Sequence, residues 1–517
     1  MGFIVTQLFL GIALLTPAAF GIVSTDLRLP LILALVALAV GIFYLPGSKA
    51  FSLQQSYLII VWSTIACCSL IPVYITGALE ALRGLLPYMV GSILLIVTCR
   101  KLSYLTGMAY FLWAISVFII LQGISQEHAG IIGQYVMVEN VPEKLAGGII
   151  ITPTLRIRGL GVIQDPNDFG QLLICTIPLL WLRWKPGSYV FNFLLTLLPA
   201  SFLLYGIYLT RSRGTLVALL AVLIFAFKDR LSVFGSAVLG TGALAGLLAS
   251  GVTGGRGISE DDGSRINLWA QSLNAFRHRP ILGIGLGQTP EITDTHQTAH
   301  NSFVLSFTET GVIGYFFFIA LLLSCWFALT HMMGERTARR KAAREKESTG
   351  ENATAALPWA IQPLTEPAPG RSARPIPALM AASPGIPSQQ RFLPGSSNPL
   401  RAPVMTYEER QAAFAASQES VPLNLRNAST SLPSHEQFEN AAFCVRLSMV
   451  GLLASCMFLS RTYSLVLYIM VGIISALVAV DPEPVNMPLK KLFRQVPLWL
   501  VGSIVVLYLV VRARPGH

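Results

Sequence analysis

The stretch from Phe303 to Thr330, FVLSFTETGVIGYFFFIALLLSCWFALT, decides the fold of this chain, and Glu309 is its only charged residue. A bilayer core about 30 Å thick needs about 20 apolar residues in a helix, so this stretch can cross it. Similar runs recur along the chain, roughly at 3–23, 29–45, 57–76, 85–99, 104–122, 169–184, 189–209, 214–227, 232–250, 442–459, 463–480 and 496–511. We therefore predict an all-α polytopic integral membrane protein with about 12–13 transmembrane helices.

Composition excludes a soluble domain. The 517 residues are 53% hydrophobic and only 12% charged, with a mean hydropathy of +0.61, which is typical of a membrane protein. The first run, 3–23, has no basic segment before it and no small-residue cleavage site, so we expect a retained span. The seven cysteines lie in apolar runs without paired spacing. We expect no disulfide framework, no metal site and no cofactor.

Lysine sets the predicted orientation. With the N-terminus in the cytoplasm, eight of the nine lysines fall inside and only Lys144 falls outside, as the positive-inside rule requires. Loops 123–168 and 251–302 then lie on the external or periplasmic face, and 251–302 carries short amphipathic helices. The predicted domains are a transmembrane bundle over 1–330 with a catalytic loop at 251–302, a disordered Pro-rich cytoplasmic insertion at 331–440, and C-terminal spans over 441–517.

Arginine does not follow lysine. Many arginines lie outside under this topology, among them Arg156, Arg158, Arg211, Arg213, Arg256, Arg265, Arg277 and Arg279. The planar fork of an arginine grips phosphate with two hydrogen bonds, so a phosphate-bearing ligand at the outer surface would explain them. The alternative is that they contact lipid headgroups or pair with acidic residues of the same loops.

Two short motifs precede the main loop. In the first, Asp165-Pro166-Asn167-Asp168 makes a turn that can cap the next helix, while Asn167 or Asp168 could also bind a sugar hydroxyl. In the second, Thr210 to Thr215 (TRSRGT), Arg211 and Arg213 would point about 200° apart on a continuous helix. Both can face one ligand only if the helix breaks near Gly214.

The main loop, Gly251 to Gly314, holds most of the reactive side chains. Ser264 is predicted to cap an amphipathic interfacial helix that begins with Arg265 and ends before Pro280. We expect Arg265 to bind the ligand, whereas Arg277 and Arg279 are explained equally well by ligand binding and by stabilisation of the helix end. The glycines of ILGIGLGQ, 281–288, follow no strand of a βαβ unit, so a nucleotide site is excluded and a turn suffices.

The segment from Thr295 to Gly314, THQTAHNSFVLSFTETGVIG, is the tightest signal. His300 precedes a membrane helix, where free N–H groups favour an anion and where an imidazole can act as a general base. Its alternative role is capping. Glu309 lies inside that helix, about 180° round from His300, and serves either the chemistry or a buried hydrogen bond. His296 and His300 have no third ligand nearby, which argues against a metal.

These motifs resemble the O-antigen ligase family of bacterial envelope enzymes, which includes O-antigen and exopolysaccharide polymerases. The resemblance covers about Arg158 to Gly314, in the order RGLGVIQDPND, SRG, SRINLW, HRPILGIGLG and HNSF…ETGVIG. The extra Arg211, the long insertion and an apparent thirteenth span depart from the family pattern.

The resemblance implies a metal-independent glycosyltransferase without cofactor in the bacterial inner membrane, with its active site facing the periplasm. It implies a donor glycan on undecaprenyl diphosphate, an acceptor in lipid A core or growing polysaccharide, contact with membrane lipids and no nucleic acid. Arg213 and Arg265 would bind phosphate and His300 would activate the acceptor, and we add as substrate-binding candidates Arg158, Asn167, Arg211, Asn301 and Glu309. Two alternatives remain: a flippase or transporter of lipid-linked saccharide, and a non-catalytic scaffold of an envelope-glycan complex.

Overall fold

Helices make up nearly all of the regular structure in this computed structural model, which describes residues 1–15, 29–145, 148–159, 161–228, 235, 242, 258–348, 435–460, 462–481 and 485–513. The chain divides into two units, Met1–Arg340 with Pro433–His517, and Lys341–Leu432. All of the packing described below belongs to the first unit.

The helices follow the apolar runs of the sequence. Their bounds are α1 Gly2–Leu15, α2 Leu29–Tyr44, α3 Gln54–Cys68, α4 Ile75–Thr98, α5 Leu102–His128, α6 Pro166–Leu179, α7 Tyr189–Asn192, α8 Leu198–Thr210, α9 Arg213–Phe227, α11 Ile258–His278, α12 Thr289–Ile292, α13 Ser302–Ser348, α16 His435–Cys456, α17 Leu465–Val480 and α18 Leu489–Arg512. Every predicted span overlaps one of these helices except 232–250, which lies outside the described residues apart from two glycines.

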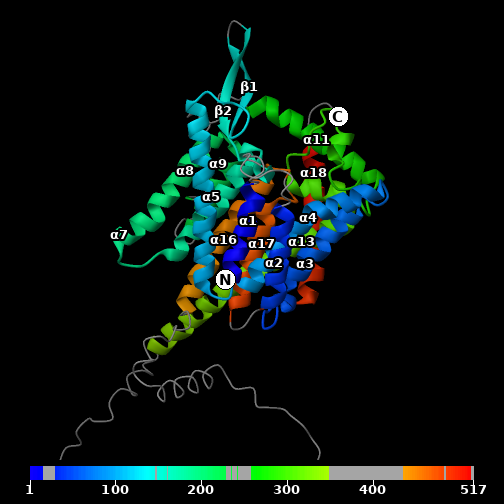
Figure 1. Ribbon diagram of the computed structural model, residues 1–517. Helices are drawn as coiled ribbons and strands as arrows, with labels where there is room; N and C mark the ends of the chain where they lie inside the picture. The colour runs from blue at the N-terminus through cyan, green and yellow to red at the C-terminus, as the bar shows by residue number, and fades with distance from the viewer. Residues whose placement is uncertain are drawn as a thin grey trace, which may run out of the picture. The chain divides into compact units, whose positions relative to one another are not determined.

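Six helical segments of the described chain are long and apolar enough to cross a membrane: Ile75–Thr98, Leu102–His128, Tyr189–Thr210, Ser302–Gly334, Glu436–Cys456 and Leu489–Arg512. The segment Glu436–Cys456, which belongs to α16, packs along α6 and α9, and α17 packs along α4. α17 is buried from Leu465 to Val478, as expected of a helix that is apolar on all sides. It therefore lies inside the bundle, surrounded by the other helices (Figure 1).

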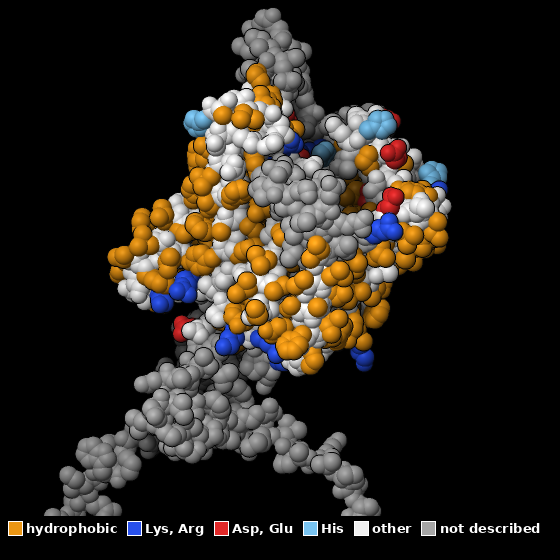
Figure 2. Space-filling model, viewed as in Figure 1, with side chains coloured by type: hydrophobic (Ala, Val, Ile, Leu, Met, Phe, Trp, Pro, Cys, Tyr) orange, Lys and Arg blue, Asp and Glu red, His pale blue; other side chains and the backbone are white. Residues whose placement is uncertain are grey.

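The two ends of the bundle differ in chemistry. Figure 1 shows α1 beginning at the lower end, and α18 finishing at the upper end near α11 and the β-hairpin. Figure 2 shows apolar side chains covering the flank, most of the visible Lys and Arg at the lower end, and His with Asp and Glu at the upper end. An apolar flank between polar ends is the pattern of a bilayer-spanning bundle.

A β-hairpin at the upper end was not predicted. β1 (Val136–Leu145) pairs antiparallel with β2 (Gly148–Ile157), in a register that sets Val136 opposite Ile157. The β-branched run GIIITPTLRI of β2 favours an extended chain. This hairpin joins α5 to α6 and forms the only sheet of the described chain.

α13 is interrupted inside its apolar stretch. Gly311 has φ 63° and ψ −167°, a backbone conformation that is essentially restricted to glycine. The segment before α12 fills the break, because Val312 N donates to Pro280 O at 2.8 Å and Gly285 N donates to Glu309 O at 3.0 Å. The residues from Val312 to Gly334 would still extend about 34 Å as a helix, enough to cross a bilayer.

We expect Gly311→Ala to destabilise the protein, because a Cβ there would lie 2.3 Å from the carbonyl oxygen of Ile281. The backbone conformation alone costs a non-glycine residue about 1–3 kcal/mol. The measurement is thermal unfolding of the detergent-solubilised protein, in which the variant should lose several degrees.

Gly84→Ala is the matched control, because Gly84 lies within α4 and a Cβ there would meet nothing within 4 Å. Alanine favours a helix by up to about 1 kcal/mol over glycine, so this variant should keep or raise the unfolding temperature. Equal behaviour of the two variants would contradict the strained break at Gly311.

Candidate functional site

Arg156, near the end of β2, connects three segments at the upper end. Its buried guanidinium donates from Nη1 to Glu139 Oε2 at 2.6 Å and from Nη2 to Asn167 Oδ1 at 3.1 Å. Its Nε donates to Thr210 O at 2.9 Å, at the end of α8. A buried charge is costly unless it is paired and hydrogen-bonded, and these contacts meet that need. Arg156 therefore holds the hairpin against the start of α6 and the end of α8.

Arg158 is engaged by backbone carbonyls. Its Nη2 donates to Gly133 O at 2.7 Å, its Nε to Gln134 O at 3.0 Å and its Nη1 to Gln164 O at 3.2 Å. These contacts fasten the chain after β2 to the chain before β1. Burial raises the pKa of the adjacent Tyr135 to about 12, so that phenol stays neutral. The contacts give Arg158 a structural role, and its part in substrate binding stays a prediction.

Asn167 links the DPND turn to the SRG motif. Asp165 caps α6 as predicted, accepting from Asn167 N at 2.7 Å. The Oδ1 of Asn167 also accepts from Ser212 Oγ at 2.6 Å. Ser212 in turn caps α9 by accepting from Thr215 N at 3.2 Å. The carbonyl half of the Asn167 amide thus holds two motifs together, and its NH₂ half is the part that can serve a ligand.

The predicted helix break at the SRG motif is present. α8 ends where Arg211 adopts a left-handed conformation with φ 51°, and α9 begins at Arg213. The break falls at Arg211 and Ser212, a little before the predicted Gly214. The Arg211 guanidinium lies 4.4 Å from the ring centroid of Tyr208, back along α8. Arg213 instead stands in the first turn of α9, where the helix dipole also favours an anion.

α11 carries Arg265 to the HNS motif. Trp269 donates from Nε1 to Ala299 O at 2.7 Å, and His300 is the next residue. Arg265 is one helical turn before Trp269 and shares its face of α11. His300 has φ 48°, a conformation that ends the preceding loop sharply and is uncommon outside glycine. The structure therefore brings the segments that carry Arg265 and His300 together.

The helix start of α11 corrects one prediction. α11 begins at Ile258, so Ser264 lies within the helix and does not cap it. The acidic residues Glu260, Asp261 and Asp262 precede Ser264 in the sequence, and negative charge near a helix N-terminus is favourable. This explains why the helix extends toward the N-terminal side of the predicted cap.

Asn301 takes the capping role that was one alternative for His300. Its buried Oδ1 accepts from Phe303 N at 2.9 Å and Val304 N at 3.2 Å, at the start of α13. The His300 side chain is therefore not needed as a cap. Ala299 and Asn301, on either side of His300, instead fix its place at the N-terminus of α13, where free N–H groups favour negative charge.

The connection between α16 and α17, residues 457–464, joins the SRG and HNS motifs. Ser302 donates from Oγ to Leu459 O at 2.6 Å and accepts on its carbonyl from Thr462 Oγ1 at 2.7 Å. On the other side, a Cβ added at Gly214 would lie 2.8 Å from Cβ of Phe458. Two neighbouring residues of one short connection thus touch the two motifs, so the N-termini of α9 and α13 lie close together.

Glu309 has a structural role at the break of α13. Its buried Oε1 accepts from Thr289 Oγ1 at 2.8 Å and from Thr289 N at 3.4 Å, at the start of α12. This matches the buried hydrogen bond that was one of its two predicted roles. It faces α12, and its part in substrate binding stays a prediction.

Within the described residues, no group of three or more His, Cys, Asp or Glu is placed to hold a metal ion. The Nδ1 of His296 donates to Pro290 O at 3.1 Å. Metal independence stays a prediction.

Sequence reasoning missed two elements of the site. Trp269 lies within the predicted amphipathic helix, but no pattern in the sequence pairs its indole N–H with Ala299, 30 residues away. The 457–464 connection lies about 160 residues beyond the HNS motif and further still beyond the SRG motif. Its one local signal is the polar run SRTYS, 460–464, between two apolar helices.

Helices of membrane-crossing length, packed around a buried helix, define an all-α polytopic membrane protein. Its polar motifs gather at one end of the bundle. Residues 198–319 match a family model described as O-antigen ligase, which confirms the predicted resemblance to that family. The matched segment runs from α8 into α13 and includes Arg213, Arg265 and His300. No curated protein and no solved structure gives a match. The family match implies a glycosyl-transfer type of enzyme.

We expect Asn167→Leu to destabilise the protein, because it leaves Arg156 and Ser212 without the Oδ1 that both contact. A buried donor left without its partner costs about 1–3 kcal/mol. Asn167→Asp keeps the acceptor and should retain most of the stability. Thermal unfolding of the three proteins in detergent measures the difference, and equal losses in both variants would contradict the linking role of Oδ1.

Proposed function

We propose that the protein is a membrane glycosyltransferase of the O-antigen ligase or polymerase type. It transfers a glycan from undecaprenyl diphosphate to an acceptor hydroxyl, on lipid A core or on growing polysaccharide, at the periplasmic face of the bacterial inner membrane. The chemistry needs no metal and no cofactor. Residues 251–302 form the catalytic loop of a bundle over 1–330, and residues 441–517 add the last spans. The insertion over 331–440, of which 349–434 lie outside the described residues, is cytoplasmic.

The convergence of three motifs carries this proposal. Contacts of Phe458 with Gly214 and of Leu459 with Ser302 draw the SRG and HNS motifs together, and the bond from Trp269 to Ala299 adds the helix of Arg265. Two helix N-termini therefore meet beside two arginines. Both features attract negative charge, and together they suit a diphosphate better than either does alone.

The proposed reaction is a direct displacement. The acceptor oxygen forms a bond to the anomeric carbon of the donor sugar, while the bond from that carbon to the diphosphate oxygen breaks and its electron pair leaves with the diphosphate. Arg213 and Arg265 stabilise the charge that builds on the leaving group, where preorganised donors contribute most. His300 removes the proton of the acceptor hydroxyl as a general base.

The remaining candidates act at a distance from the reacting atoms. Arg211 binds the lipid-diphosphate from the left-handed turn between α8 and α9. Asn167 offers its NH₂ group to a sugar hydroxyl, and Asn301 supports His300 by capping α13. The hydrogen bonds of Arg158 and Glu309 favour structural roles at the edge of the site. We propose these two residues as substrate contacts only where the groups that they bind move away.

A flippase or transporter is the main alternative. Such proteins carry binding charge near the bilayer midplane in interrupted helices. The interruption of α13 at Gly311 is filled by the chain from Pro280 to Gly285, and Glu309 beside it is bound to Thr289. These contacts leave no charged group of the break directed at a transport path, which favours the enzyme.

We expect His300→Asn and Arg265→Lys to reduce transfer by at least about 100-fold. Asparagine tolerates the left-handed conformation of position 300 but cannot act as a base, and general-base catalysis is worth about 10²–10⁴-fold. Lysine keeps the charge of position 265 and loses the bidentate fork. The assay combines purified protein, polyprenyl-diphosphate glycan and acceptor.

His296→Asn is the matched control, because His296 is also a non-glycine residue with positive φ, at 51°, in the same loop. It should keep most of the transfer activity. Full activity of His300→Asn in correctly inserted protein would defeat the assignment of the base.

The product of the same assay separates the two enzyme types. A ladder of lengths identifies a polymerase, whereas a single addition to a lipid acceptor identifies a ligase. Translocation of the lipid-linked glycan without a new glycosidic bond would favour the flippase.

The scaffold alternative predicts that the Pro-rich insertion is essential. We expect deletion of residues 345–430 to leave transfer by the purified protein within about twofold, since these residues fall in the unit Lys341–Leu432, apart from the unit that holds the three motifs. Complete loss of transfer in a stable deletion variant would support the scaffold.

A further inference from the structure

Two adjoining hollows lie along α11, about 240° round the helix from Arg265 at the position of Gln271. The first has a volume of about 370 Å³ and lies between α11 and the chain around Asp294. The second, of about 330 Å³, continues toward Glu291 and Gln288. Both are lined by Ala275 and Ile292, so they form one continuous surface depression, here named the α11–α12 groove.

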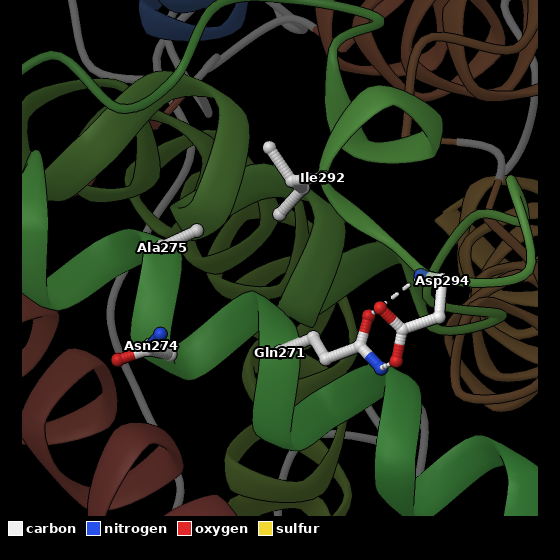
Figure 3. A pocket seen from close by; sticks show the side chains of 5 residues that line it. All are labelled: Gln271, Asn274, Ala275, Ile292 and Asp294. Atoms are coloured by element: carbon white, nitrogen blue, oxygen red, sulfur yellow. Dashed lines mark hydrogen bonds between the residues drawn. The ribbon is translucent and has the colours of Figure 1, made fainter.

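A reciprocal pair of hydrogen bonds forms one wall of this groove. Gln271 donates from Nε2 to Asp294 Oδ2 at 2.8 Å, and its Oε1 accepts from Asp294 N at 3.0 Å. Figure 3 shows the two side chains meeting edge to edge, while Ala275 on α11 extends toward Ile292. Ala275 and Ile292 supply a small apolar surface next to this polar wall, and Asn274 stands at its rim.

The lining of the groove selects its ligand by chemistry. Carboxylates accept hydrogen bonds from hydroxyl groups, and amide side chains both donate and accept. The carboxylates Asp294 and Glu291 share the lining with Arg279 and His278, so the groove presents mixed charge and not the purely basic cluster that favours a phosphate. Its apolar side chains alternate with these polar groups, which disfavours an acyl chain. A hydroxyl-rich ring with one apolar face meets all of these conditions. The ligand that fits is a saccharide.

The groove lies within reach of the proposed catalytic site. Trp269 is hydrogen-bonded to Ala299, and Gln271 is hydrogen-bonded to Asp294. One stretch of α11 therefore contacts both ends of the segment that leads to His300. The six residues from Asp294 to His300 span at most about 20 Å. A glycan of a few sugars whose reacting end lies at His300 can therefore place its remote sugars in the groove.

We infer that the α11–α12 groove binds sugar residues remote from the bond being formed and so selects substrates by glycan length. This inference rests on the proposed transferase function. The saccharide belongs either to the donor or to the acceptor, since both end at the same reacting centre. Binding of remote, non-reacting groups is one way in which an enzyme favours its full-length substrate.

The test fills the groove with Ala275→Phe, which adds a ring without removing any hydrogen bond. Asn274→Leu, at an exposed rim position, removes one amide with little risk to folding. Asn267→Phe is the matched control, because it adds the same ring at an exposed position of α11 outside the groove. Transfer is measured with donors of one sugar and of several repeats at fixed acceptor, and then with short and long acceptors at fixed donor.

We expect Ala275→Phe to raise KM about tenfold for long substrates, the effect of losing about one to two hydrogen bonds, and to leave short substrates unchanged. The effect should appear in only one of the two arms, which identifies the donor or the acceptor as the source. Asn267→Phe should match the unchanged protein in both arms. If Ala275→Phe and the unchanged protein have equal KM values for every glycan length, the inference that the groove binds sugars is wrong. Glycan transfer in the same assay would still support the proposed function.

A binding measurement keeps the two proposals distinguishable. Oligosaccharides released from the lipid-linked glycan of the cell should bind the detergent-solubilised protein in calorimetric titration, and Ala275→Phe should weaken that binding about tenfold. If the unchanged protein transfers no glycan yet binds these oligosaccharides, the transferase proposal fails and the groove stands. Unchanged binding by Ala275→Phe overturns the groove.

Discussion

Ser302 is the residue on which the upper end of the bundle depends. It donates to Leu459 O and accepts from Thr462 Oγ1, so the start of α13 is fixed to the connection between α16 and α17. In a membrane protein each buried polar group must find its partner within the chain, and this exchange satisfies a hydroxyl, two carbonyls and a second hydroxyl together. The positions of Asn301 and His300 follow from it, because they directly precede Ser302.

The same requirement, that buried polar groups be hydrogen-bonded, explains why the arginines at this end have two kinds of role. Arg156 and Arg158 donate hydrogen bonds to Glu139, Asn167 and backbone carbonyls, and these bonds hold the chain between α5 and α6 in place. Arg213 and Arg265 instead stand on helices that lead into the convergence of motifs. Arginine thus provides both the structural hydrogen bonds and the proposed ligand-binding charge at one end of the bundle. The sequence alone does not separate these two groups of arginines.

Local physics made much of this predictable. Apolar runs marked the helices, since about 20 such residues are needed to cross a bilayer, and Asp165 was recognised as a cap because capping involves residues two or three apart. The break between α8 and α9 followed from the angular separation of Arg211 and Arg213. Ser264 was misassigned, because the helix gained further turns from the acidic residues before it. The 457–464 connection and the partner of Trp269 were out of reach, since each is a contact between distant segments.

The place of the α16–α17 connection in the chain has a consequence for biogenesis. Arg213, Arg265 and His300 all leave the ribosome well before residues 457–464 have been synthesised, and domains begin to fold while synthesis continues. A nascent chain that stops before α16 would contain every motif of the family-matched segment and still lack the piece that draws two of them together. The contacts that draw the SRG and HNS motifs together can therefore form only after the chain between α16 and α17 has been synthesised.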